Sequence, residues 1–315
     1  MDVVVDAVDR PESIPMCAGI VGTAAGLPIV EYLHASAASW DRVPTVLGFS
    51  GGGVSGAMLA MLAEHLAAQR IRLVSFDMPG HTPTGLLGRD TPPRALVSRV
   101  TGAVRHAVSV AMIRRWQPRS SRLEALSHSA GLVDVARLIR EYGTWIDRFV
   151  ICGAPIPGFS AMVQAARAAA AAQSLPRISL WQLIKTRQLP SGNADLMYGP
   201  TAARLISDDT LARYECAEHF SVALTLLRSG PVLGQDWGGR RIVLVGSPGD
   251  AIAPPDRIRT AASRLRARGA VVRLEILPTQ LPHAFLSFQS AAEWVADLIA
   301  GPDEFSAFDS GGSVQ

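Results

Sequence analysis

The sequence predicts an α/β fold, with a mostly parallel central sheet, helices on both faces and an inserted helical cap. Short apolar runs of strand length alternate with segments of helical periodicity as far as residue 157. The same alternation resumes at residue 238, and residues 158–237 between the two regions show helical patterning alone. Strands that alternate with helices are typical of a parallel sheet with both faces covered.

Residues 1–157 form the first part of the predicted core. Two short apolar runs around a glycine-rich turn predict an opening hairpin, and later apolar runs bounded by turn residues predict buried strands. Helices are predicted where apolar residues recur on one face of a 3.6-residue period. The expected elements are, in order, the strands Ala18–Gly22, Ile29–His34 and Val43–Phe49, a helix over 55–69, the strand Ile71–Asp77, a helix over 93–114, the strand Leu123–Leu126, a helix that ends at about Tyr142, and the strand Arg148–Ala154.

Residues 158–237 are predicted to be the cap, helical throughout and without a strand-like run. Its expected helices cover 159–173, 178–187 and 208–227, and loops rich in Pro, Gly and Asn separate them. The second part of the core is residues 238–300. It is expected to contain the strand Arg241–Gly246, a helix over 255–268, the strand Val271–Leu277 and a helix over 291–299. The polar tail, residues 301–315, is expected to be frayed.

Composition excludes several classes of protein. Of 315 residues, 48% are hydrophobic and 18% charged, which excludes an intrinsically disordered chain. The formal net charge of +3 is small and the basic residues are scattered, so no nucleic-acid partner is expected. No apolar stretch is long enough to span a membrane, and the acidic start does not resemble a signal peptide. Cys17, Cys152 and Cys216 suggest neither a disulfide framework nor a metal site, so a soluble cytoplasmic protein without metal or cofactor is expected. The oligomeric state is not indicated.

Three predicted strand ends carry reactive residue types. Ser129 follows the strand Leu123–Leu126 on a tight turn, Asp250 follows the strand Arg241–Gly246, and His283 follows the last strand. Ligand sites of parallel sheets lie at the carboxyl ends of the strands, so these three side chains are expected to meet. A histidine can take the serine proton, and a carboxylate on its other nitrogen fixes the tautomer. We therefore predict Ser129 as nucleophile, His283 as general base and acid, and Asp250 as the residue that orients the imidazole.

These residues, in the chain order Ser, Asp, His, resemble the α/β-hydrolase superfamily over about residues 17–300. Ser127-His128-Ser129-Ala130-Gly131 is similar to the family's G-x-S-x-G turn, with Ser127 at the first glycine position. Leu47-Gly48-Phe49-Ser50-Gly51-Gly52 is similar to its H-G-F-x-G-G loop, with Leu47 in place of the histidine, and Asp77-Met78-Pro79-Gly80-His81 to its D-x-P-G turn. The resemblance implies that Phe49 donates one N–H to an oxyanion, and Ala130, directly after the nucleophile, is expected to donate the other.

Each assignment has an alternative. Ser129 could be an ordinary helix N-cap, Ser127 could be the nucleophile, and Asp256 competes with Asp250, although Asp256 suits the start of a helix better. His283 could be a satisfied half-buried histidine. The glycine run at 51–53 lacks the lysine of a phosphate loop, which argues against nucleotide binding.

The predicted function is that of a serine hydrolase that cleaves an ester, lactone or thioester through an acyl-Ser129 intermediate. Large aromatic residues in the cap predict a small-molecule substrate with a hydrophobic or bulky acyl group. The expected substrate-binding residues are Ser50, His128, Trp181, Tyr198 and Tyr214. Two alternatives remain: an acyltransferase or cyclising thioesterase-like enzyme with the same triad, and an inactive binding protein on the same fold.

Overall fold

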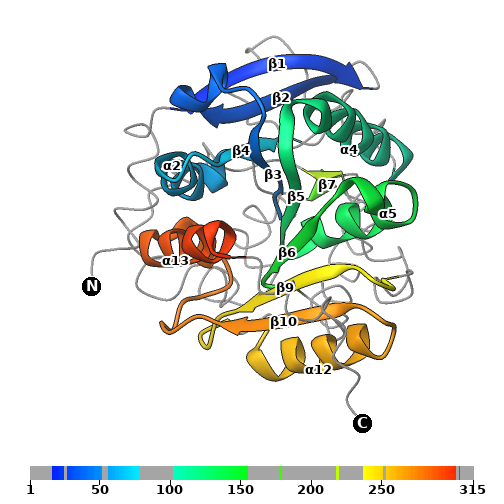
Figure 1. Cartoon of the computed structure of the whole chain (residues 1–315), viewed down its shortest axis with the longest axis vertical. Coiled ribbons are helices and arrows are strands. Elements are labelled where there is room, and N and C mark those ends of the chain that lie inside the picture. Colours follow the sequence, from blue (N-terminus) through cyan, green and yellow to red (C-terminus); the bar gives the residue numbers. More distant parts are fainter. Residues whose placement is uncertain are drawn as a thin grey trace.

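The fold is described from a computed structural model of the 315-residue chain, shown in Figure 1. The structure describes residues 16–24, 27–51, 56–77, 102–154, 177–178, 218–219, 237–250, 253–302 and 305. Eight of the described strands form one sheet in the order β1-β2-β4-β3-β5-β6-β9-β10. All neighbours from β4 to β10 are parallel, whereas β2 runs antiparallel to both β1 and β4. The predicted α/β class and the opening hairpin are thus confirmed.

The strands of this sheet begin and end close to the predicted runs. They are β1 (Met16–Ala24), β2 (Leu27–His34), β3 (Val43–Phe49), β4 (Arg72–Phe76), β5 (Ser120–His128), β6 (Arg148–Cys152), β9 (Arg241–Gly246) and β10 (Val271–Ile276). The α-helices are α2 (Ala60–Ala68), α4 (Gly102–Trp116), α5 (Leu132–Tyr142), α12 (Pro255–Arg266) and α13 (Gln289–Ala300). Short 3-10 turns lie at η2 (Ala35–Ser39), η3 (Gly56–Leu59), η4 (Gln117–Arg119), η5 (Ser129–Gly131), η6 (Gly143–Trp145) and η8 (Phe285–Ser287).

Helices cover both faces of the sheet: α2 and α13 lie on one side, and α4, α5 and α12 on the other (Figure 1). The central strands therefore bury side chains in both directions, because successive residues of a strand point to opposite faces. In β6, Phe149 and Ile151 join the core beneath α4, α5 and α12, whereas Val150 and Cys152 join the core beneath α2 and α13. This two-sided burial explains why the strands read as continuous apolar runs.

Two expectations need correction. β5 was expected only over 123–126 but extends from Ser120 to His128, because its polar ends pair with β3 and β6. The cap was expected to be helical throughout, and this is wrong at four residues. Arg177–Ile178 (β7) and Glu218–His219 (β8) form an antiparallel two-stranded pair, in which non-local pairing overrides local helical patterning. The rest of the predicted cap, and residues 93–101 of a predicted helix, lie outside the described residues.

A buried ion pair between β5 and the first residue of β6 is also hydrogen-bonded to the end of α13. Arg148 donates to both carboxylate oxygens of Glu124, at 3.0 and 2.9 Å, and also to the Ile299 carbonyl at 2.6 Å. Arg122 lies 2.7 Å from the same carboxylate. These contacts stabilise the part of the sheet near the amino-terminal end of β6. Among the described residues, no helix combines the length and apolar character needed to cross a lipid bilayer.

Candidate active site

Ser129 lies at the sharp turn between β5 and α5. Its φ of 51° is in the left-handed region, which a residue other than glycine enters only at a cost in free energy. The turn projects the hydroxyl from the carboxyl end of a central strand, and the side chain is 8% exposed. A strained serine between strand and helix is the geometry that the sequence predicts for a nucleophile.

Close contact between this turn and the end of β3 requires glycine at position 131 and leaves little room for a side chain at position 51. A Cβ at Gly131 would lie 2.3 Å from the Phe49 carbonyl oxygen and 2.8 Å from that of Ser50. A Cβ at Gly51 would lie 3.2 Å from the Ser129 Cβ. The loop after β3 therefore packs directly on the serine turn.

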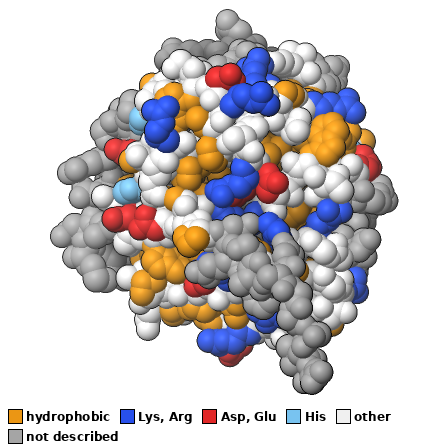
Figure 2. Space-filling view, in the orientation of Figure 1, with side chains coloured by type: hydrophobic (Ala, Val, Ile, Leu, Met, Phe, Trp, Pro, Cys, Tyr) orange, Lys and Arg blue, Asp and Glu red, His pale blue; other side chains and the backbone are white. Residues whose placement is uncertain are grey.

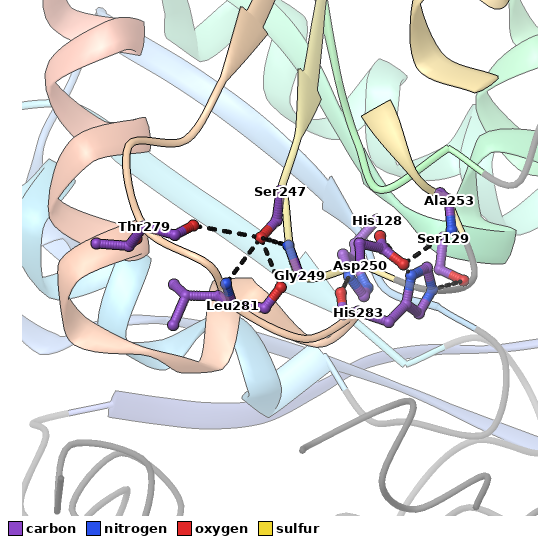
Figure 3. A network of polar contacts seen from close by, with 9 residues as sticks. All are labelled: His128, Ser129, Ser247, Gly249, Asp250, Ala253, Thr279, Leu281 and His283. Atoms are coloured by element: carbon purple, nitrogen blue, oxygen red, sulfur yellow. Dashed lines mark hydrogen bonds and ion pairs between the residues drawn. The ribbon is translucent and has the colours of Figure 1, made fainter. Parts of the chain in front are cut away.

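The three predicted catalytic side chains, from three different loops, form one hydrogen-bonded chain (Figure 3). His283 Nε2 lies 2.7 Å from Ser129 Oγ, and His283 Nδ1 lies 2.9 Å from Asp250 Oδ2. Because a carboxylate only accepts hydrogen bonds, Nδ1 carries the proton and Nε2 is left to accept from the serine hydroxyl. The imidazole is thus held in the tautomer that can remove the serine proton.

Asp250 is oriented by its own loop. Its second oxygen, Oδ1, accepts the Ala253 N–H at 2.8 Å, and its backbone N–H donates to the Ser247 carbonyl at 3.1 Å. The rival carboxylate, Asp256, lies in the first turn of α12, is 93% exposed and pairs with Arg259. Asp250 is therefore the carboxylate that contacts the imidazole.

Gly153, directly after β6, lies beside the His283–Asp250 pair. Its φ is 56°, and a Cβ there would lie 3.3 Å from His283 Cε1 and 3.4 Å from Asp250 Oδ2. Sequence reasoning did not single out this residue, although the Cys-Gly-Ala step at a strand end is a signal that could have done so.

His128 is buried beside His283. Its Nε2 lies 2.9 Å from the His283 carbonyl oxygen, and its ring lies 5.2 Å from the His283 ring and 5.8 Å from that of Phe285. Burial, and next the electrostatic influence of the neighbouring His283 imidazole, lower the pKa of His128 to about 4. His128 is 1% exposed and contacts the loop that carries His283, and its expected contact with substrate stays a prediction.

Ser247 is a further residue that sequence reasoning missed. Its hydroxyl donates to the Leu281 carbonyl at 2.5 Å and accepts the Leu281 N–H at 2.9 Å, so it joins the loop of Asp250 to that of His283. A Cβ at Gly249 would lie 2.8 Å from the same Leu281 carbonyl oxygen. A serine within Gly-Ser-Pro-Gly reads as a turn residue, and no sequence signal marks this contact.

The remaining predicted residues are placed as follows. Phe49 is the last residue of β3, buried and in register with Ser127, and Ser50 follows it, also buried. Ala130 lies in η5, directly after the serine. Ser127, the alternative nucleophile, is fully buried within β5, and the structure gives its hydroxyl no hydrogen-bond partner among the described residues. Trp181, Tyr198 and Tyr214 lie outside the described residues.

Two other predicted features have structural explanations. Asp77, which begins the D-x-P-G sequence, accepts the Tyr32 hydroxyl at 2.6 Å and the Gly56 N–H at 2.7 Å, and so anchors the start of η3. Burial raises the pKa of the Cys152 thiol, which keeps it protonated and apolar in the core. In the part of the chain that the structure describes, no group of three or more His, Cys, Asp or Glu side chains is arranged to hold a metal ion.

Comparison with solved structures identifies the fold, whereas no protein-family profile matches the sequence and no relative is found among curated proteins. The monoglyceride lipase of Saccharomyces cerevisiae is 14% identical with a TM-score of 0.64, covering 90% of this chain and 96% of the lipase. A bromoperoxidase from Bacillus anthracis is 15% identical with a TM-score of 0.61, covering 90% and 99%. The thioesterase domain from the curacin biosynthetic pathway is 14% identical with a TM-score of 0.58, covering 91% and 99%. The chain thus has the α/β-hydrolase fold.

Proposed function

We propose that this protein is a serine hydrolase that cleaves a carboxylic ester, lactone or thioester. One observation carries the proposal: the Ser129 hydroxyl lies 2.7 Å from a histidine nitrogen whose partner nitrogen is bound by Asp250. An N-cap role for Ser129 would not require an imidazole at this distance. The names of the similar structures, which include lipases, esterases and a thioesterase, support the same reaction class.

In the proposed reaction, Ser129 Oγ attacks the carbonyl carbon while His283 Nε2 takes the hydroxyl proton. The carbon–oxygen double bond opens, and its electron pair moves to the carbonyl oxygen. The tetrahedral intermediate collapses when His283 returns the proton to the leaving alcohol or thiol, which leaves an acyl-Ser129. Water then repeats the two steps and releases the acid, and Asp250 stabilises the imidazolium formed each time.

The negative oxygen of the intermediate would be stabilised by two backbone N–H groups, those of Ala130 and Phe49. The tight packing of the serine turn on the end of β3 supports this assignment, because it brings both peptides to the same end of the sheet. In well-studied enzymes the loss of one such donor costs about 3–4 kcal/mol of transition-state stabilisation. A hydrophobic or bulky acyl group remains the preferred substrate, on the strength of the aromatic residues in the predicted cap.

The test is covalent labelling with a fluorophosphonate probe. The wild-type protein should be labelled, and labelling should be lost in Ser129→Ala and reduced to a trace in His283→Ala. Ser127→Ala is the matched control, because it removes a buried hydroxyl two residues away and should be labelled at the wild-type rate. Unchanged labelling in Ser129→Ala would refute the proposal.

Substrate preference is then measured with nitrophenyl esters of increasing acyl length. The proposal expects the specificity constant to rise with acyl length, since an apolar chamber gains roughly 0.8 kcal/mol for each buried methylene. Product analysis with and without an added alcohol or amine separates hydrolysis from acyl transfer, and the free acid is expected as the main product in both cases.

A further inference from the structure

Two polar side chains from other loops bind the main chain that carries the catalytic histidine. We call residues 281–283 the histidine segment. His128, the last residue of β5, lies with Nε2 2.9 Å from the carbonyl oxygen of His283. Ser247, from the loop of Asp250, exchanges two hydrogen bonds with the backbone of Leu281, at 2.5 and 2.9 Å. The segment is thus bound at both of its ends, as Figure 3 shows.

The contact of His128 fixes its protonation. A carbonyl oxygen only accepts, so Nε2 carries the hydrogen, and the neutral ring then has no hydrogen on Nδ1. Nδ1 is buried and makes no hydrogen bond to the described residues, so a second proton there would lack an acceptor. The lowered pKa of about 4 agrees with this geometry. His128 is therefore an uncharged hydrogen-bond donor and does not compete with His283 for the serine proton.

The position of His128 in the chain couples the nucleophile to the base. It directly precedes Ser129, and its ring packs against both His283 and Phe285, which belong to the loop after β10. Any displacement of that loop is opposed by the same dipeptide that places the Ser129 hydroxyl. Ser247 acts from the other side, because its carbonyl accepts the Asp250 N–H at 3.1 Å while its hydroxyl binds Leu281.

We propose that His128 and Ser247 are positioning residues, which hold the histidine segment so that the His283 imidazole stays within hydrogen-bond reach of Ser129 and Asp250 together. The proposal rests on the proposed function. Neither side chain hydrogen-bonds the Ser129 hydroxyl or the His283 imidazole, so both act through the main chain that carries His283. The imidazole has little freedom to shift, because its two hydrogen bonds are 2.7 and 2.9 Å long and a movement of about 1 Å would break either of them.

The test compares two replacements of His128. His128→Phe keeps a ring in the same space but removes the donor, whereas His128→Gln places an amide N–H where Nε2 was. We expect His128→Phe to lower kcat on a nitrophenyl ester by about 10- to 100-fold with KM changed less than about twofold, since a misplacement of about 1 Å can cost about 10²-fold. His128→Gln should recover most of the loss. His106 is a partly exposed histidine of α4, so His106→Phe is the matched control and should leave kcat unchanged.

A spectroscopic readout separates positioning from a general loss of stability. The proton on His283 Nδ1, donated to Asp250, should give a downfield proton resonance in wild type, His128→Gln and His106→Phe. It should broaden or disappear in His128→Phe. Ser247→Ala should act in the same direction on kcat and on the resonance, and it carries the test if His128→Phe does not fold.

Wild-type kcat and a wild-type resonance in folded His128→Phe, or in Ser247→Ala, would overturn the assignment for that residue. An equal loss of kcat in His128→Gln and His128→Phe would also overturn it for His128, since the donor would then not matter. Failure of the proposed function looks different. In that case Ser129→Ala keeps its labelling and turnover, whatever the His128 variants do.

Discussion

Gly131→Ala adds one methyl group where the serine turn meets the end of β3. The new Cβ would lie 2.3 Å from the Phe49 carbonyl oxygen, and real Cβ atoms stay at least 3.0 Å from such atoms. The turn and the strand end must therefore separate by at least about 0.7 Å. The atoms that the new Cβ meets are backbone atoms, so no side chain can move aside. The backbone of Gly131 is right-handed helical, with φ −58°, so alanine brings no strain of its own.

The expected result is a large loss of reactivity and a moderate loss of stability. Displacement of the turn moves Ser129 Oγ away from His283 Nε2, and about 10²-fold slower fluorophosphonate labelling follows from a shift of this size. Overpacking of a tight contact lowers the free energy of unfolding by about 1–3 kcal/mol. The labelling rate constant and urea unfolding of the same sample measure the two effects.

Gly143→Ala is the matched control at the other end of α5. Gly143 has a similar φ of −61°, but the three atoms nearest to a Cβ there belong to the guanidinium end of the flexible Arg240 side chain, which can shift. We expect wild-type labelling and a gain in the free energy of unfolding of about 0.4–1 kcal/mol, because alanine restricts the unfolded chain. Equal labelling rates in Gly131→Ala and Gly143→Ala would show that the contact with Phe49 does not position the serine.

Three further outcomes are expected. Asp250→Asn should keep the fold but slow fluorophosphonate labelling by about 10³- to 10⁴-fold, since an amide can hold the imidazole in the wrong tautomer. Labelling kinetics measure this, and a decrease in the labelling rate of less than tenfold would contradict the proposed role of Asp250. Between pH 7 and pH 4, the free energy of unfolding of the wild type should fall by about 3 kcal/mol more than that of His128→Gln. The reason is that His128 of the unfolded chain takes up a proton at about pH 6.5, whereas the buried ring of the folded protein has a pKa of about 4. Urea unfolding at each pH measures this difference, and parallel pH curves for the two proteins would count against it. Arg148→Met should lower the free energy of unfolding by about 3–5 kcal/mol, because the buried charge of Glu124 loses its main partner. The double variant with Glu124→Leu should recover much of that stability. Wild-type stability of Arg148→Met in urea unfolding would exclude a structural role for the pair.

The sequence predicts the sheet well, because its signals are local. Buried parallel strands read as apolar runs, and β9 has the expected bounds, Arg241–Gly246. The extent of β5 was underestimated because Ser127 and His128 are polar, and only pairing with Phe49 of β3 and Cys152 of β6 makes them strand residues. The pair β7–β8 was missed for a similar reason, since two residues are too few to show an alternating pattern.

In the candidate site, too, some residues could be predicted from the sequence and others could not. Ser129, Asp250 and His283 could be selected because reactive residue types directly follow predicted strands, and the sheet brings strand ends together. The roles of His128 and Ser247 depend on which backbone groups lie opposite them, across 155 and 34 residues of sequence. Residue type carries no information about such pairings. A small residue at Gly131 was expected from the G-x-S-x-G-like turn, but its close approach to the Phe49 and Ser50 carbonyl oxygens could be seen only in the structure.

The chain leaves the sheet after β6 and re-enters it at β9, the neighbouring strand, where the Gly153 N–H donates to the Val245 carbonyl at 3.0 Å. The two ends of the intervening stretch are thus adjacent in the sheet. The entropic cost of closing a loop between them grows only slowly with the length of the loop. Because β6 and β9 pair with each other directly, the order of these strands in the sheet does not depend on the number of residues between 155 and 236.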